Sequence, residues 1–105
     1  MVLVSLNDDG RSINMHVGEN VTIRLPENAT SGYRWAIDRF DETLLELLSA
    51  RPDYKSEAVG SSGNVSFTLR GIHAGEGEAV LKNWRQWEGD KSIMRYFRLR
   101  IGIVP

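Results

Sequence analysis

Residues 97–103 read Phe-Arg-Leu-Arg-Ile-Gly-Ile, with an apolar residue at every second position. Successive side chains of a β-strand point to opposite faces of a sheet, so this spacing buries one face and leaves Arg98 and Arg100 in water. The same alternation recurs at Ile13, Met15 and Val17, at Val21, Ile23 and Leu25, and at Val65, Phe67 and Leu69. The sequence therefore predicts half-buried strands in antiparallel sheets.

Further strands are expected over residues 1–6, 33–37 and 78–87, and residues 50–54 can form another. Turn-forming residues separate the runs; they lie at 8–10, 18–20, 75–77 and 88–90. Short strands with turns at regular intervals predict an all-β fold, an immunoglobulin-like antiparallel β-sandwich with Greek-key order.

Residues 41–48 carry four leucines, and their spacing fits a short amphipathic helical turn as well as a strand. Asp41 or Thr43 would cap such a turn, and Pro52 would limit its length. We expect a strand here and keep the helical turn as the alternative.

Length and composition restrict the classes of function. The 105 residues suit one domain, residues 1–105, and the chain has no cysteine for a thiol nucleophile, a disulfide or a thiolate metal site. Thirteen Lys and Arg against 14 Asp and Glu give a net charge of -1, so no overall field attracts nucleic acid or an anionic membrane. We expect no cofactor, no metal, no nucleic acid, no membrane and a monomer.

The apolar start, residues 1–6, lacks a basic region and is too short for a signal peptide or a membrane span. We expect a cytoplasmic protein if Met1 is the native start, and a periplasmic or secreted one if a signal peptide has been removed.

Catalytic groups are scarce. His16 and His73 have no second histidine or metal-ligand motif beside them, and we interpret both as ordinary surface residues. The carboxylates are scattered along turns, and the glycine-rich stretches 60–63 and 75–77 complete no phosphate-binding motif. The sequence therefore predicts a protein that is not an enzyme.

Three stretches stand out, at residues 28–35, 60–64 and 84–89. We expect Trp35 and Trp84 to fill the core. Alternation along the expected strand would put Trp87 on the face opposite Trp84, and a tryptophan beside an arginine at a strand end is typical of a binding hot spot.

These stretches resemble the inhibitory loops of the chagasin family of cysteine protease inhibitors, which read Asn-Pro-Thr-Thr-Gly-aromatic, Gly-x-Gly-Gly and Arg-Pro-Trp in that order. The matching residues are, in the first motif, Asn28, Ala29, Thr30, Ser31, Gly32 and Tyr33; in the second, Gly60, Ser61, Ser62 and Gly63; and in the third, Arg85, Gln86 and Trp87. Ala29 and Gln86 replace prolines that would stiffen the loops. Ser31 keeps a hydroxyl, and Ser62 replaces a glycine.

The resemblance implies a reversible inhibitor of papain-like cysteine proteases of the papain and cathepsin type, which occludes the active-site cleft with three loops. Residues 30–32 would reach the catalytic centre, and the second motif would lie along the non-primed side. The third motif would cover the primed side. All thirteen residues are candidate protease-binding residues, with no catalytic or metal-binding residue among them.

The alternative is a generic immunoglobulin-like protein- or carbohydrate-binding module without protease inhibition. Asn20, Asn28 and Asn64 each begin a glycosylation sequon. A glycan on Asn28 would obstruct the first motif, so we hypothesise a bacterial protein that does not pass through a eukaryotic secretory pathway.

Overall fold

The computed structural model describes residues 2–28, 31–53 and 62–105. Its strands, in chain order, are β1 Val2–Val4, β2 Ser12–His16, β3 Asn20–Asn28, β4 Arg34–Phe40, β5 Leu45–Asp53, β6 Ser62–Gly71, β7 Gly75–Trp84 and β8 Arg95–Val104. Short 3-10 turns are η1 Leu6–Asp8, η3 Gln86–Glu88 and η4 Asp90–Ser92. None of the helical segments in these ranges is long and apolar enough to cross a membrane.

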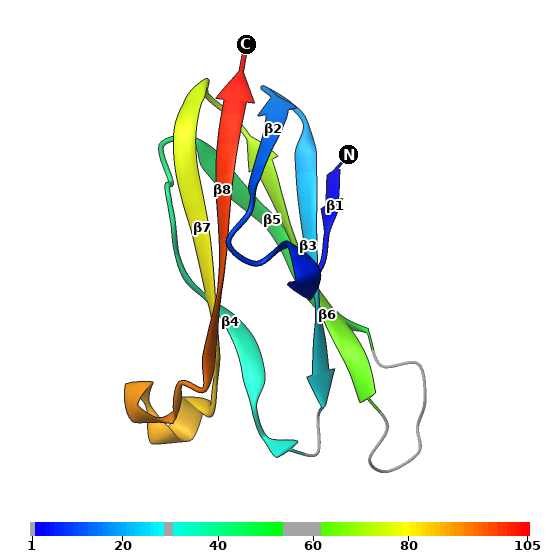
Figure 1. Ribbon diagram of the computed structural model, residues 1–105, viewed down its shortest axis with the longest axis vertical. Helices are drawn as coiled ribbons and strands as arrows, with labels where there is room; N and C mark the ends of the chain where they lie inside the picture. The colour runs from blue at the N-terminus through cyan, green and yellow to red at the C-terminus, as the bar shows by residue number, and fades with distance from the viewer. Residues whose placement is uncertain (1, 29–30, 54–61) are drawn as a thin grey trace.

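The strands form two four-stranded sheets, ordered β1-β3-β6-β5 and β2-β8-β7-β4, which face each other as a sandwich (Figure 1). The chain passes from one sheet to the other after each of β1, β2, β3, β4 and β6, whereas β5–β6 and β7–β8 are neighbours within a sheet. This is the order of an immunoglobulin-type sandwich with one added edge strand, β2. The predicted β-sandwich is confirmed.

The core lies between the sheets and is built from the alternating positions. Phe97, Leu99, Ile101 and Ile103 of β8 are all buried. From the other three predicted runs, the buried members are Met15, Val21, Ile23, Leu25, Val65, Phe67 and Leu69. Ile13 is half-buried against this core, and Val17 is exposed, because β2 ends at His16 and Val17 lies in the following turn with 43% of its surface exposed.

Two edge pairings are parallel, where antiparallel pairing was expected. β1 runs parallel to β3, and β2 runs parallel to β8. A tight hairpin forces antiparallel pairing, but β1 and β3 are joined by residues 5–19, which is long enough for a crossover. That connection includes β2, which belongs to the opposite sheet.

Residues 45–48 form a strand, and the helical alternative is limited to one turn, in which the backbone N–H of Leu45 bonds the carbonyl oxygen of Asp41 at 3.0 Å. Residues 42–44 form a turn, and β5 begins at Leu45, whose side chain is buried in the core. Leu45 and Leu47 pair with Gly71 and Leu69 of β6, and these ladder bonds favour the extended chain. Pro52 is tolerated because β5 is an edge strand.

Candidate functional site: the end of the sandwich that carries the three motifs

The three motifs are flanked by strand ends that meet at one end of the molecule, where β3 ends, β4 and β6 begin and β7 ends (Figure 1). The register pairs Asn28 with Ser62 and Arg34 with Trp84. The sheets therefore bring the flanks of all three motifs together. Four predicted site residues lie outside the described ranges: Ala29, Thr30, Gly60 and Ser61.

The first and third motifs are in direct contact. Gly32 has a φ of +80°, which favours glycine, and a Cβ at this position would lie 2.9 Å from Cη2 of Trp87. The indole of Trp87 therefore packs against bare backbone. A larger residue at position 32 would displace Trp87 and strain the chain at the same time.

Arg85 joins the same two motifs through its guanidinium group. Its Nη2 donates a hydrogen bond to the carbonyl oxygen of Ser31 at 3.2 Å, and its Nη1 donates to Oε1 of Glu88 at 3.1 Å. The guanidinium carbon lies 4.4 Å from the ring centre of Tyr33, in cation–π geometry. Arg85 therefore stabilises the contact within the molecule.

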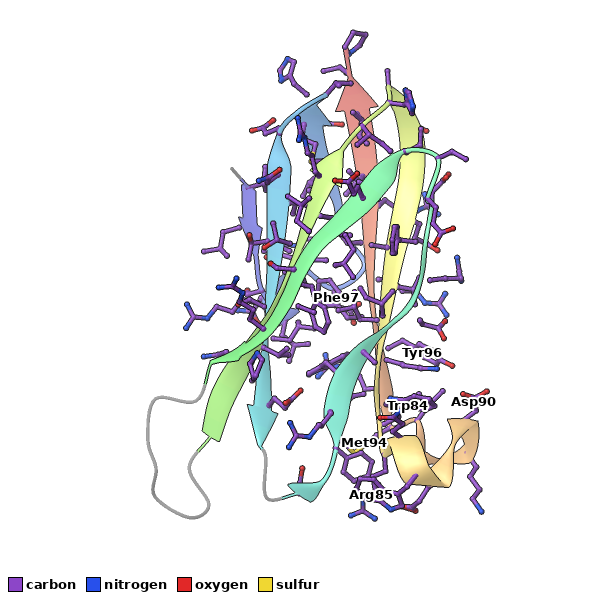
Figure 2. The ribbon with its side chains drawn as sticks, turned by 180° about the vertical axis from the view of Figure 1, so that it is seen from behind. Trp84, Arg85, Asp90, Met94, Tyr96 and Phe97 are labelled. Atoms are coloured by element: carbon purple, nitrogen blue, oxygen red, sulfur yellow. The ribbon has the colours of Figure 1, made fainter. Side chains whose placement is uncertain are left out.

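Residues 85–94 form a compact hook between β7 and β8. The hydroxyl of Ser92 accepts a hydrogen bond from the backbone N–H of Arg85 at 2.9 Å and lies 2.7 Å from the carbonyl oxygen of Gly89. Lys82 Nζ lies 3.5 Å from a carboxylate oxygen of Asp90, which ties η4 to the sheet. Figure 2 shows Arg85 and Asp90 at this hook, so Trp87 is presented from a tied structure.

The expected positions of the tryptophans are partly corrected. Trp35 is in the core with 6% of its surface exposed, as predicted. Trp84 lies outside the core cluster and is half-buried, with Lys82 Nζ over its ring at 3.6 Å from the centre. β7 ends at Trp84, so the strand alternation does not reach Trp87, which lies in η3 with 71% of its surface exposed.

Glu27 is a residue that the sequence analysis missed. It is the one buried charged or polar side chain in the described ranges, with 6% of the residue exposed. Its Oε2 accepts the backbone N–H of Trp35 at 2.9 Å, and its Oε1 lies 3.5 Å from Nη1 of Arg34. A glutamate at a strand end is normally exposed, so nothing in the local sequence indicates this role.

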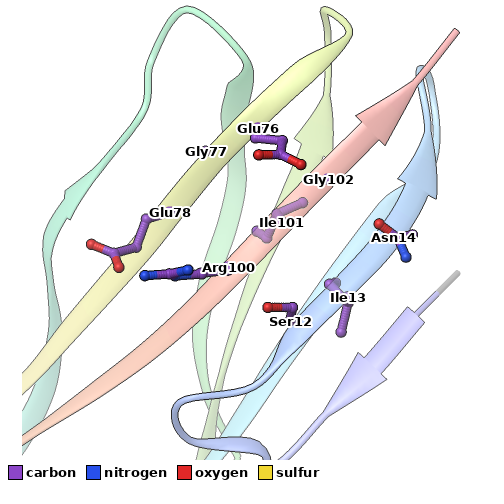
Figure 3. Close-up of a pocket in the computed structure, with 9 residues that line it drawn as sticks. All are labelled: Ser12, Ile13, Asn14, Glu76, Gly77, Glu78, Arg100, Ile101 and Gly102. Atoms are coloured by element: carbon purple, nitrogen blue, oxygen red, sulfur yellow. The ribbon is translucent and has the colours of Figure 1, made fainter.

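Hollows lie at both ends of the part of the chain that the structure describes. One, of about 260 Å³, lies beside Gly32, Trp84 and Trp87 at the motif-bearing end. The other lies at the far end of the second sheet, beside Glu76, Glu78, Arg100 and Gly102 (Figure 3). Glu78 there pairs with Arg39 at 3.1 Å, which occupies that carboxylate in a surface ion pair.

The described residues hold no group of three or more His, Asp or Glu side chains that could bind a metal ion. His16 and His73 are both exposed. One carboxylate is electrostatically perturbed, at the end opposite the motifs, where the backbone N–H of His16 donates to Glu19 at 2.9 Å and lowers the pKa of Glu19.

The model of the chagasin family of peptidase inhibitors matches residues 14–101, a span that includes all three motifs. The chain belongs to this family. The family explains why the first and third motifs, which are far apart in the sequence, meet at one end of a β-sandwich.

Individual proteins of similar sequence or structure agree with this family assignment. Amoebiasin-1 of Entamoeba histolytica is 26% identical over 102 residues, which cover 95% of this chain and 99% of the relative. The crystal structure of the cysteine protease inhibitor EhICP2 from Entamoeba histolytica superposes with a TM-score of 0.86 at 20% identity, over 98% of this chain and 95% of that one. The structure of PbICP-C in complex with falcipain-2 superposes with a TM-score of 0.74 at 14% identity, over 99% of this chain and 100% of that one.

The inferred bacterial source finds no support in these comparisons. The two relatives whose organism is given both come from Entamoeba histolytica, a eukaryote. The sequon argument is therefore not a guide to the source of this chagasin-family chain.

Proposed function

We propose that residues 1–105 form one inhibitor domain that binds papain-like cysteine proteases reversibly and is not an enzyme. The observation that carries the proposal is the contact between Gly32 and Trp87, tied by Arg85, at one end of the sandwich. The chain's family and the printed descriptions of its relatives, a cysteine protease inhibitor and a complex with falcipain-2, support the class of target.

The inhibitor acts by occlusion of the active-site cleft. The first motif, residues 28–33, enters the cleft at its catalytic centre, and the second, residues 60–63, pairs with the non-primed side through main-chain hydrogen bonds. Trp87, with 71% of its surface exposed, anchors the primed side. Such an interface buries about 1,600 Å² in total.

No covalent step is required in this mechanism. Small side chains and glycine let the backbone of the first motif approach the protease closely, and the ties at Arg85 and Ser92 hold the third motif in place before binding. Ordering the contact surface in advance reduces the entropy lost on association. We assign Arg85 to this internal role, since its guanidinium already bonds Ser31 and Glu88.

The test is steady-state inhibition of papain and a cathepsin L-type protease by the purified chain, with trypsin as the control. Reversible inhibition of the two cysteine proteases and not of trypsin is expected. Absence of inhibition of both at micromolar inhibitor would contradict the proposal, and the protein- or carbohydrate-binding module would then be the better account.

A further inference from the structure

Glu27 and the pair Arg34 and Trp35 stand on either side of the first motif. Glu27 is the next-to-last residue of β3, and Arg34 is the first residue of β4. The Glu27 carboxylate reaches both partners across this gap, at 2.9 Å to the backbone N of Trp35 and 3.5 Å to Nη1 of Arg34. Trp35 also returns a bond, from Nε1 to the carbonyl oxygen of Pro26 at 3.0 Å.

The Glu27 carboxylate is buried at a cost in free energy that its bonds must offset. The Glu27 side chain is 3% exposed, whereas that of Arg34 is 55% exposed, so the negative charge gives up more water than its partner does. Burying a charge is unfavourable unless it is paired and hydrogen-bonded, and an apolar residue of similar volume would avoid that penalty but remove the acceptor of the Trp35 backbone N–H. The carboxylate combines an acceptor for the backbone N–H of Trp35 with a negative charge beside Arg34, across the base of the first motif.

We propose that Glu27 is a positioning residue for protease binding, which closes the base of the first motif and holds it in the conformation that binds. This inference rests on the proposed function and deepens it. Glu27 never has to touch the protease, because it acts through the backbone of Trp35 and the side chain of Arg34.

We call Glu27, Arg34 and Trp35 the clamp. The contacts of the clamp extend to the other two motifs. Residues 32 and 33, which directly precede Arg34, meet Trp87 and Arg85 of the third motif. Across the sheet, Glu27 pairs with Gly63, the last residue of the second motif. A shift at Glu27 therefore moves the base of one motif and the flanks of two others.

A chain without the clamp populates the binding conformation for only a fraction of the time, and its apparent affinity falls by that fraction. The loss appears in the association rate, because the bound complex has the same contacts once formed. Glu27→Gln keeps an acceptor for the Trp35 N–H and loses the charge, whereas Glu27→Met loses both.

The experiment measures association and dissociation rates of each variant with papain by stopped-flow or surface plasmon resonance. The expected association rates are lower by about threefold for Glu27→Gln and about tenfold for Glu27→Met, with dissociation rates within about twofold of the parent. The matched control is Glu78→Gln. It removes the charge from an ion pair with Arg39, in which the two side chains are 3.1 Å apart and lie away from the motifs, and it leaves both rates unchanged.

The outcomes separate this inference from the proposed function. If the parent chain inhibits papain and folded Glu27→Gln and Glu27→Met associate as fast as the parent, the positioning role is wrong and the proposed function stands. If circular dichroism shows that Glu27→Met does not fold, the association rate of Glu27→Gln alone decides whether the positioning role is correct. If the parent does not bind papain at all, amide hydrogen exchange of residues 31–35 tests the clamp directly: faster exchange in Glu27→Gln supports it, and unchanged exchange overturns it.

Discussion

The base and the tip of the motif-bearing end each hold a tryptophan, and the two are placed in opposite ways. At the base, Trp35 is 6% exposed and bonds Pro26 and Glu27 through its ring N–H and its backbone N–H. At the tip, Trp87 is 71% exposed and rests on the backbone of Gly32. One indole holds strands together, and the other is exposed, where we propose that it contacts the protease.

This difference shows how a small sandwich presents a large apolar side chain without relying on it for folding. Core packing and the bonds of Glu27 hold the base in place, so the side chain at the tip is not needed to stabilise the fold. Substitution of the core residue Trp35 at the base should therefore change the free energy of unfolding, and substitution of Trp87 at the tip should change the affinity for the protease. Glu27 is the base residue that we propose also affects binding.

The largest expected effect is at the base. Trp35→Ala removes a buried indole and its hydrogen bond to the carbonyl oxygen of Pro26, and we expect the free energy of unfolding to fall by about 3–5 kcal/mol. Urea denaturation followed by circular dichroism measures the change. A loss under about 1 kcal/mol would contradict the role of Trp35 in the core.

The next largest effect is at the tip. Trp87→Ala should weaken binding to papain by about 2 kcal/mol, or about thirtyfold in Kd, because an exposed tryptophan anchor is lost. Its free energy of unfolding should stay within about 0.5 kcal/mol of the parent, since a surface side chain is removed. Equal inhibition constants for parent and variant would remove Trp87 from the interface.

A smaller effect is expected at Arg85, which ties the first motif to the third. Arg85→Lys keeps the charge and loses the planar guanidinium that bridges Ser31 and Glu88, so binding should weaken by about 1 kcal/mol, or about fivefold. Arg100→Lys, on the exposed face of β8, is the matched control and should inhibit as the parent does. An inhibition constant for Arg85→Lys equal to that of the control would show that the tie is dispensable.

The smallest effect is expected at the opposite end of the sandwich. The hydrogen bond from His16 lowers the pKa of Glu19 in the folded chain, so Glu19 contributes stability at neutral pH that is lost as the pH falls through its folded pKa. Glu19→Gln should therefore melt at a slightly lower temperature than the parent at pH 7, with the gap closing in acid. Inhibition at pH 7 should be unchanged, and a weaker inhibitor would show that this end also matters for binding.

The sequence predicted the fold well because alternation reports which face of a strand is buried. Phe97, Leu99, Ile101 and Ile103 all pack in the core as predicted. Alternation contains no information on where a strand stops, which is why Val17 was wrongly placed. The four leucines of residues 41–48 were ambiguous for a related reason, since only the pairing of Leu45 and Leu47 with β6 decides between strand and helix.

The site was predictable only in part. Residues 31–33 and 85–87 were identified from their motifs, and their assignment to protease binding stays a prediction. Trp87 was expected to be exposed from an alternation that ends three residues earlier, so the expectation was correct for the wrong reason. Glu27 and Ser92 were missed because their roles depend on partners that the tertiary fold supplies, and both look like ordinary polar residues in the sequence.

The most direct test of the account is an amide hydrogen-exchange comparison of the free chain and its complex with inactivated papain. The account predicts that binding slows exchange in residues 31–35 and 85–89, with little change in β2 and at the start of β7. Slowed exchange confined to β2 and the start of β7, beside the hollow at Glu76 and Arg100, would show that the protease binds elsewhere and would contradict the central claim.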